Sequence, residues 1–167
     1  MTTKIGISGH QRLDDPRAWE WVESAMTRVL NMATPPVVGI SSLAVGTDQL
    51  FASLVVRFGG QIHAVIPFPG YERTFDPQEV VTYYKLLSAA TEVEIMRTVG
   101  TDEDSYLAAG KRVVDLADYM ITVWNEQPAK GKGGTADVVA YAIEKRKRLV
   151  NLNPVDRIVD MLSSGDG

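Results

Sequence analysis

The chain has 167 residues, a length typical of one domain, and 45% hydrophobic and 23% charged residues, as in a folded protein. The absence of cysteine excludes disulfides, thiolate metal sites and cysteine nucleophiles, and two histidines argue against a multi-histidine metal site. A net charge of −4 argues against binding duplex nucleic acid by phosphate neutralisation. No long apolar run or signal-peptide pattern occurs, so we expect a cytoplasmic protein that does not enter membranes.

The first half of the chain alternates short β-rich runs with segments whose apolar residues recur at helical spacing. Asp15 with Pro16, and Asp76 with Pro77, each combine a good N-cap with a proline suited to the first helical turn. Each pair therefore predicts a helix start. In chain order we predict a strand at residues 4–8, a helix from 15 that ends before 34, a strand at 37–41, a helix at 47–58, a strand at 62–68 and a helix from 76.

The second half continues this alternation. Thr101 and Asp104 have the spacing of a capping box at a helix start. After residue 154 we expect one short helix, and residues 163–167 as a frayed tail. In chain order we predict an edge strand at 92–98, a helix at 101–116, a strand at 119–124, a helix at 135–147 and a strand at 149–152.

This order of elements predicts an α/β fold for residues 1–167 as a single domain. We expect a three-layer sandwich, with a mostly parallel sheet of about six strands and helices on both faces. In such sheets the ligand crevice lies beyond the carboxyl ends of the strands. The residues that directly follow each strand are therefore the candidates for binding.

Small, hydroxylated and glycine residues gather in these loops. Gly133, Gly134 and Thr135 open a helix, where free backbone N–H groups favour an anion and glycine permits close approach of a phosphate. Lys132 adds positive charge. Ordinary turn chemistry is the alternative explanation, and the spacing matches neither a Walker A loop nor a GxGxxG fingerprint. The candidate ligand-binding residues are Ser8, Gly9, His10, Arg12, Ser42, Gly46, Thr47, Lys132, Gly133, Gly134 and Thr135.

Two carboxylates lie near the predicted crevice. Asp48 either caps its helix, contacts a ribose hydroxyl or stabilises an oxocarbenium-like centre, and Asp137 is either a first-turn acid or catalytic. His10 either contacts a ligand or is satisfied by the backbone. Asp48 and Asp137 are thus the candidate catalytic residues, and we expect no metal and no cofactor.

Five segments taken together resemble the SLOG superfamily, which includes the DNA-processing protein DprA and the Lonely Guy cytokinin-activating enzymes. They are most similar to its small YpsA-like members. The resemblance implies a Rossmann-like sheet that binds a nucleotide or nucleotide-derived ligand, of ADP-ribose or nucleoside-phosphate type. The segments are residues 6–10 (GISGH), 42–48 (SLAVGTD), 64–68 (AVIPF), 117–118 (AD) and 132–137 (KGGTAD).

The phosphoribohydrolase branch of this superfamily carries the motif Pro-Gly-Gly-x-Gly-Thr-x-x-Glu, with a catalytic glutamate. In this sequence Lys132 precedes the glycines and Val138 stands at the glutamate position, with Asp137 one residue earlier. A shift of one residue turns a side chain by about 100° around a helix. The sequence therefore departs from the hydrolase pattern where the catalytic glutamate should lie.

Three functions follow as hypotheses. The first is a sensor or binding protein for a nucleotide-derived ligand. The alternatives are a nucleoside 5′-monophosphate phosphoribohydrolase and a DNA-associated protein of the DprA kind. The net negative charge of the chain argues against the DNA-associated protein. The resemblance also suggests a homodimer or higher homo-oligomer, to which Trp19 or Trp21 could contribute if exposed on the first helix.

Overall fold

The computed structural model describes residues 1–128 and 133–163. Within these residues, seven strands form one sheet in the order β4-β3-β2-β1-β5-β6-β7. The strands are β1 (Thr3–Gly9), β2 (Val37–Ser41), β3 (Gln61–Ile66), β4 (Glu92–Ile95), β5 (Tyr119–Val123), β6 (Arg148–Asn153) and β7 (Ile158–Leu162). The helices are α1 (Ala18–Asn31), α2 (Thr47–Arg57), α3 (Pro77–Ala89), α4 (Asp102–Leu116) and α5 (Thr135–Glu144), with a short 3₁₀ helix η1 (Tyr71–Thr74).

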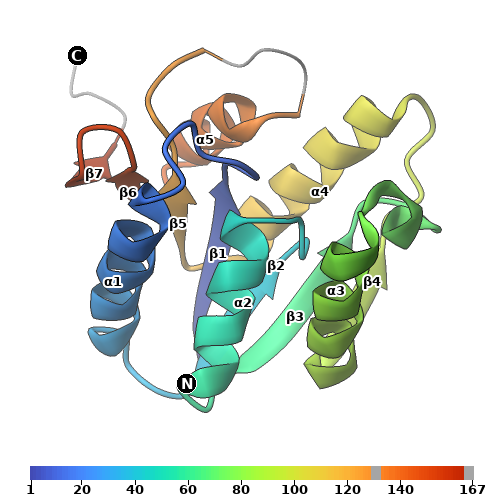
Figure 1. Ribbon diagram of the computed structural model, residues 1–167, viewed down its shortest axis with the longest axis horizontal. Coiled ribbons are helices and arrows are strands. Elements are labelled where there is room, and N and C mark those ends of the chain that lie inside the picture. The colour runs from blue at the N-terminus through green and yellow to red at the C-terminus, as the bar shows by residue number, and fades with distance from the viewer. Residues whose placement is uncertain (129–132, 164–167) are drawn as a thin grey trace.

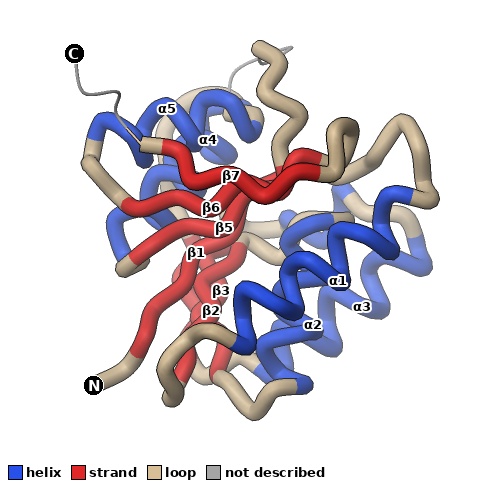
Figure 2. The backbone as a smooth tube through the Cα atoms, turned by 90° about the vertical axis from the view of Figure 1, so that its left-hand side faces the viewer, coloured by secondary structure: helices blue, strands red, loops and turns tan. Residues whose placement is uncertain are grey.

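The sheet is the middle of three layers, as the sequence predicted. Helices α1, α2 and α3 cover one face, and α4 and α5 cover the other (Figures 1 and 2). One apolar cluster, which includes Met26 and Phe51, fills the first interface. A second, which includes Val113 and Met120, fills the other. Strands β1 to β6 are parallel because each is reached by a crossover that places a helix on the sheet.

The direction of winding reverses beside β1. From β1 the chain adds β2, β3 and β4 towards one edge, and then returns to place β5 on the other side of β1. The loops after β1 and β5 therefore lead to helices on opposite faces. A crevice opens between two such loops, and it is the usual ligand position in a doubly wound sheet.

Local capping signals were confirmed at two helices. Asp76 and Glu79 form a capping box at the start of α3, and Thr101 and Asp104 form one at the start of α4. Each pair satisfies backbone N–H groups that have no partner inside the helix. These two starts follow from residues only three positions apart, which explains why the sequence predicted them.

The first helix was predicted to have Asp15 as its N-cap and Pro16 as its first residue, and this start was wrong by two residues. The Asp15 carboxylate accepts the backbone N–H of Arg17, two positions later, at 3.1 Å, and the Asp15 carbonyl accepts the N–H of Ala18 at 3.0 Å. These bonds form a turn in front of α1, which begins at Ala18. Trp19 and Trp21 are partly buried against the core, so the expectation that either is exposed was also wrong.

The expected short helix after residue 154 is a strand. The Asn153 side chain accepts the N–H groups of Val155 and Asp156, and its carbonyl accepts that of Arg157 at 2.9 Å. This tight turn reverses the chain, and β7 pairs antiparallel with β6. The seventh strand thus extends the predicted sheet of about six strands.

No helix within the described ranges is both long and apolar enough to cross a membrane. Of the tail predicted to be frayed, residues 164–167 lie outside the described residues.

Candidate functional site

His10 and Asn125 join the two loops that diverge beside β1. The backbone N–H of His10 donates to the carbonyl of Val123 at 3.1 Å, and the backbone N–H of Asn125 donates to Nε2 of His10 at 3.2 Å. Burial lowers the pKa of His10, so the ring is neutral at pH 7. Because Nε2 accepts a hydrogen bond, the ring proton lies on Nδ1.

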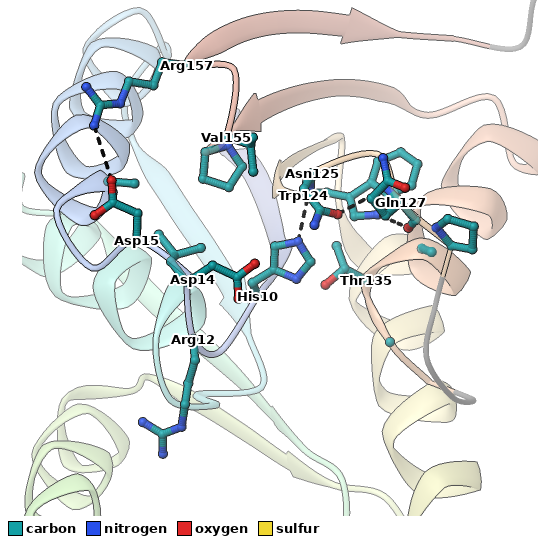
Figure 3. A pocket seen from close by; sticks show the side chains of 16 residues that line it. His10, Arg12, Asp14, Asp15, Trp124, Asn125, Gln127, Thr135, Val155 and Arg157 are labelled. Atoms are coloured by element: carbon teal, nitrogen blue, oxygen red, sulfur yellow. Dashed lines mark hydrogen bonds and ion pairs between the residues drawn. The ribbon is translucent and has the colours of Figure 1, made fainter.

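A cavity of about 630 Å³, which we call the wide cavity, opens on one side of His10 (Figure 3). Its walls come from the loops after β1 and β5, the start of α5 and the β6–β7 turn. Apolar surfaces of Trp124 and Val155 lie among charged groups of Asp14, Asp15 and Arg157. The wide cavity is lined by His10, Arg12, Leu13, Asp14, Asp15, Ala18, Trp124, Asn125, Gln127, Pro128, Gly134, Thr135, Ala136, Pro154, Val155 and Arg157.

A second cavity of about 430 Å³, which we call the acidic cavity, lies between the loops after β1, β2 and β3 and the helices α4 and α5. Its charged lining residues in the described chain are Asp48 and Glu103. It shares His10, Gly134 and Thr135 with the wide cavity. The acidic cavity is lined by Ile7, Ser8, Gly9, His10, Gln11, Ser42, Ala44, Asp48, Pro67, Tyr71, Glu103, Tyr106, Gly110, Val113, Gly133, Gly134, Thr135 and Val138.

Asp48 is the buried carboxyl of the acidic cavity. Its side chain turns back from the first turn of α2 and accepts the backbone N–H of Ala44 at 3.3 Å, and also that of Ser42. Burial outweighs these bonds and raises the pKa of Asp48 to about 7. The carboxyl therefore exchanges a proton close to neutral pH, a property typical of functional sites.

The loop between β2 and α2 is held in a strained conformation. Leu43 is fully buried with a φ of 55°, a left-handed value that costs a leucine about 1 kcal/mol or more. Its N–H donates to Oγ of Ser41 at 3.0 Å, and its carbonyl accepts Nε2 of Gln49 at 3.1 Å. These bonds fix the N–H groups of the loop where they meet the Asp48 carboxylate.

Gly46 and Thr47 fasten this loop to the one after β1. Gly46 has a φ of 82°, and a side chain there would collide with the backbone of Gln11. The Thr47 hydroxyl donates to the His10 carbonyl at 2.8 Å, and Thr47 is fully buried. Neither residue lines either cavity, so their placement favours a structural role over the predicted contact with a ligand.

The start of α5 lies where the two cavities meet. Gly133 has a φ of 85° and packs tightly against the backbone of α4, and its N–H donates to the Asp137 carboxylate at 2.8 Å. Asp137 therefore holds the turn and lines neither cavity, which disfavours the predicted catalytic role. Gly134 and Thr135 face both cavities, with the N–H groups of the first helical turn beside them.

Most of the predicted ligand residues lie at the cavities. Arg12 lines the wide cavity, but its guanidinium pairs with Glu79 at 2.8 Å, and Figure 3 shows it pointing away from His10. Lys132 lies outside the described residues. The predicted residues that line the acidic cavity are Ser8, Gly9, His10, Ser42, Asp48, Gly133, Gly134 and Thr135.

Sequence reasoning did not assign Tyr71, Glu103 and Tyr106 to the site, although all three line the acidic cavity. Glu103 lies in the first turn of α4, where an acidic residue is ordinary because it favours the helix dipole. Tyr71 follows the loop after β3, so its position was the available signal, but an aromatic residue there is equally typical of a core. Only the packing of η1 against α4 brings these side chains to the cavity.

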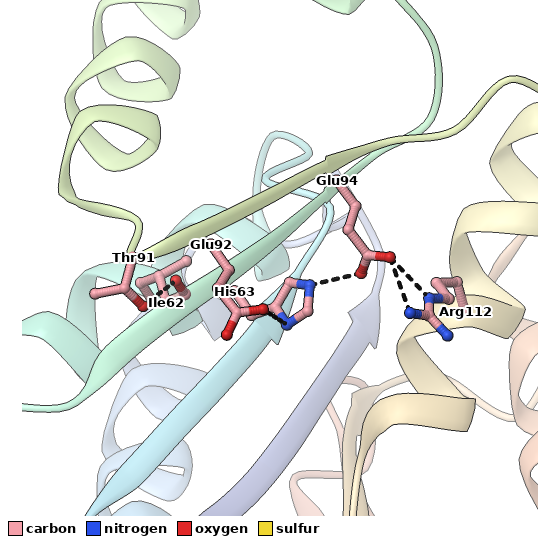
Figure 4. A network of polar contacts seen from close by, with 6 residues as sticks. All are labelled: Ile62, His63, Thr91, Glu92, Glu94 and Arg112. Atoms are coloured by element: carbon pink, nitrogen blue, oxygen red, sulfur yellow. Dashed lines mark hydrogen bonds and ion pairs between the residues drawn. The ribbon is translucent and has the colours of Figure 1, made fainter.

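His63, the second histidine of the chain, lies outside both cavities. Its Nε2 is 2.6 Å from Glu94, its Nδ1 is 3.4 Å from Glu92, and Arg112 of α4 pairs with Glu94 at 2.9 Å (Figure 4). This network ties the edge strand β4 to β3 and α4. Its role is thus to support the sheet edge.

No family model and no curated protein matches the chain. Several solved structures, however, are similar to the chain. DprA from Streptococcus pneumoniae is 16% identical with a TM-score of 0.62 over 91% of this chain and 50% of its own. DprA from Helicobacter pylori, described with a single-stranded DNA binding mode, is 17% identical with a TM-score of 0.61 over 90% of this chain and 65% of its own. The chain thus spans less than two thirds of either DprA.

A third solved structure is the molybdenum cofactor carrier protein from Chlamydomonas reinhardtii, 15% identical with a TM-score of 0.53 over 90% of this chain and 76% of its own. With the sheet order and the crevice beside β1, these likenesses define a Rossmann-like three-layer α/β protein. It is the fold of the two DprA structures, as the resemblance of the loop motifs implied.

Proposed function

We propose that the protein binds a nucleotide-derived ligand, of nucleoside-phosphate or ADP-ribose type, as a sensor or binding protein. The observation that carries the proposal is that the wide and acidic cavities meet at His10, Gly134 and Thr135. A ligand with an anionic middle and two polar ends matches this arrangement. Its phosphates would lie at the N-terminus of α5, where unpaired N–H groups and the helix dipole favour negative charge.

The wide cavity suits a base and its ribose. Trp124 and Val155 offer apolar surface, and Trp124 is held in place because its indole N–H donates to the Gln127 carbonyl at 2.9 Å. Asp14 and Asp15 offer acceptors for hydroxyl or amino groups. The wide cavity thus combines apolar surface with polar and charged groups that can orient a ligand.

Retention of nucleotides on the protein tests the proposal. Stoichiometric protein is mixed with adenine, guanine and pyrimidine nucleotides, ADP-ribose and a single-stranded oligonucleotide, and the retained and free fractions are separated by ultrafiltration and identified by mass spectrometry. Retention of an intact nucleotide is expected. Thr135→Ala should weaken phosphate-dependent retention, while Thr98→Ala, at an exposed threonine outside both cavities, should not.

A second candidate function is hydrolysis of an N-glycosidic bond. It is favoured by one observation: the Asp48 carboxyl lines the acidic cavity and has a pKa of about 7, suited to acid–base work at neutral pH. In this case the same assay releases free base and ribose phosphate, and Asp48→Asn abolishes the release. Intact ligand in every fraction argues for binding alone.

Salt-sensitive retention of the oligonucleotide would instead support a DNA-associated function. One neighbour is described as binding single-stranded DNA and another as carrying a molybdenum cofactor, so both the oligonucleotide and small ligands belong in the comparison.

A further inference from the structure

Tyr71 presents an unused hydroxyl group at the acidic cavity. The residue is 2% exposed and lines the cavity, yet its hydroxyl makes no hydrogen bond to the rest of the described chain. Edge-to-face contacts with Phe68, Phe75 and Tyr83, at centroid distances of 5.7, 4.8 and 5.7 Å, hold its ring in place. No enclosed side-chain polar atom of the described chain lacks a hydrogen-bond partner, so this hydroxyl meets the open space of the cavity, where a ligand or water can bond to it.

Tyr71 and Asp48 act on the same part of the cavity. Burial, and then the nearby Asp48 carboxyl, raise the pKa of Tyr71 well above its ordinary value, so the phenol stays protonated and remains a donor. Asp48 adds carboxyl oxygens, and Ser8 and Ser42 add hydroxyl groups to the same lining. Together they offer both donors and acceptors to a ligand.

The charge of the cavity selects against phosphate. Asp48 and Glu103 line it, His10 is neutral, and no lysine or arginine lies among the described lining residues. A phosphate in the acidic cavity would place its negative oxygens near two carboxyl groups, and the described lining residues include no cation. A sugar hydroxyl, in contrast, can donate to a carboxylate and accept from a phenol.

We propose that the acidic cavity takes the uncharged, hydroxyl-bearing end of the ligand and excludes a terminal phosphate, with Asp48 and Tyr71 as the specificity-determining residues. The inference rests on the proposed function, because the phosphates of the ligand are taken to lie where the two cavities meet. The preferred ligand class is then a nucleoside diphosphate that carries a sugar, rather than a nucleoside triphosphate.

Three probes that share adenosine and two phosphates test this inference. ADP-ribose ends in a sugar, ADP ends at the second phosphate, and ATP adds a third. Isothermal titration should show that ADP-ribose binds more tightly than ADP, by about tenfold for one or two hydrogen bonds, and that ATP binds more weakly than ADP. ADP is the reference for ADP-ribose, because the net charge of −4 repels the more highly charged ATP whether or not the acidic cavity contributes.

Substitutions test which side chains cause the preference for ADP-ribose. Tyr71→Phe removes only the hydroxyl group. It should weaken the affinity for ADP-ribose by about three- to tenfold and leave the affinity for ADP unchanged. Tyr83→Phe is the matched control: Tyr83 is equally buried and contacts the Tyr71 ring, but it does not line the cavity. Asp48→Asn removes a carboxyl group that is ionised above about pH 7, so in titrations above that pH it should narrow the difference between the affinities for ADP-ribose and ATP. Thermal unfolding of each variant checks that it is folded.

Each result leads to a distinct conclusion. If ADP, ADP-ribose and ATP bind alike and Tyr71→Phe changes nothing, the inference is wrong while the proposed function stands. If the wild-type protein binds none of the three nor any other nucleotide, both are wrong. A preference for ADP-ribose that falls in Tyr71→Phe and persists in Tyr83→Phe supports the inference.

Discussion

The backbone N–H of Asn125 donates a hydrogen bond to Nε2 of His10 at 3.2 Å, which links the loops after β5 and β1 where the winding of the sheet reverses. The two residues are 115 positions apart in the chain. The bond holds the imidazole where the wide and acidic cavities meet, and it leaves Nδ1–H as the ring donor, without an acceptor in the described chain. A ligand that crosses from one cavity to the other passes this group.

We expect His10→Ala to reduce both ligand affinity and stability. The Asn125 N–H loses its acceptor, which should lower the free energy of unfolding by about 1 kcal/mol. Urea unfolding and titration with the retained nucleotide measure the two effects. His63→Gln is the control, since His63 lies outside both cavities. Equal losses of affinity in both variants would show that His10 has no special place in the site.

The pH dependence of stability should change in Asp48→Asn. The pKa of Asp48 is raised from 3.8 to about 7 in the folded protein, so its contribution is fully present below pH 3.8 and is lost as the pH rises through about 7. At about 1.4 kcal/mol for each pKa unit, the loss is on the order of 4 kcal/mol. Asparagine does not ionise, so the variant should gain stability relative to wild type between pH 4 and pH 8.

Urea unfolding of both proteins at several pH values measures this difference, and other titrating groups cancel because they are shared. A constant difference between the two proteins across this range would contradict the raised pKa. A gain in the variant as the pH rises would support it.

Gly46→Ala should destabilise the protein more than Gly59→Ala. Both glycines have a left-handed φ, of 82° and 78°, so both variants carry a similar backbone cost of about 1 kcal/mol. At Gly46 the new methyl group would also collide with the backbone of Gln11, whereas at Gly59 nothing lies within 4 Å. Thermal unfolding compares the two. Similar melting temperatures would show that the close contact between the two loops is absent in solution.

Asp137→Ala should lower the stability of the fold and have little effect on any hydrolysis of the ligand. The carboxylate accepts the Gly133 N–H at 2.8 Å and lies in the first turn of α5, so its loss should cost about 1–2 kcal/mol. Glu20→Ala in the first turn of α1 is the control, because it removes only the interaction with the helix dipole. If hydrolysis is observed and depends on Asp137 in an otherwise stable variant, the structural role assigned to it is wrong.

Signals that depend on near neighbours in the chain were sufficient for much of the fold. The capping boxes at Asp76 and Thr101 involve residues three positions apart. The alternation of strands and helices follows from the local spacing of apolar residues. The turn at Asn153 is local as well, but its hydrogen bonds form only when β6 has a free edge on which β7 can pair. That pairing replaced the helix expected after residue 154.

For the candidate site, too, some features were predictable from the sequence and others were not. The sequence by itself determined that small and glycine residues follow the strands, and that these loops gather at one edge of a parallel sheet, because strand direction fixes where every strand ends. It did not determine which side chains turn into the crevice. Thr47 bonds to His10, Arg12 pairs with Glu79, and Asp137 bonds to Gly133.

Only the tertiary structure placed Tyr71 and Glu103 beside Asp48 in one cavity. The physical reason is that a side chain makes the contacts that strand order and helix packing bring within reach, and these join residues that are far apart in the chain. Burial is likewise a property of the assembled fold. It lowers the pKa of His10 and raises that of Asp48, and so gives these two residues the charge states on which the proposed chemistry depends.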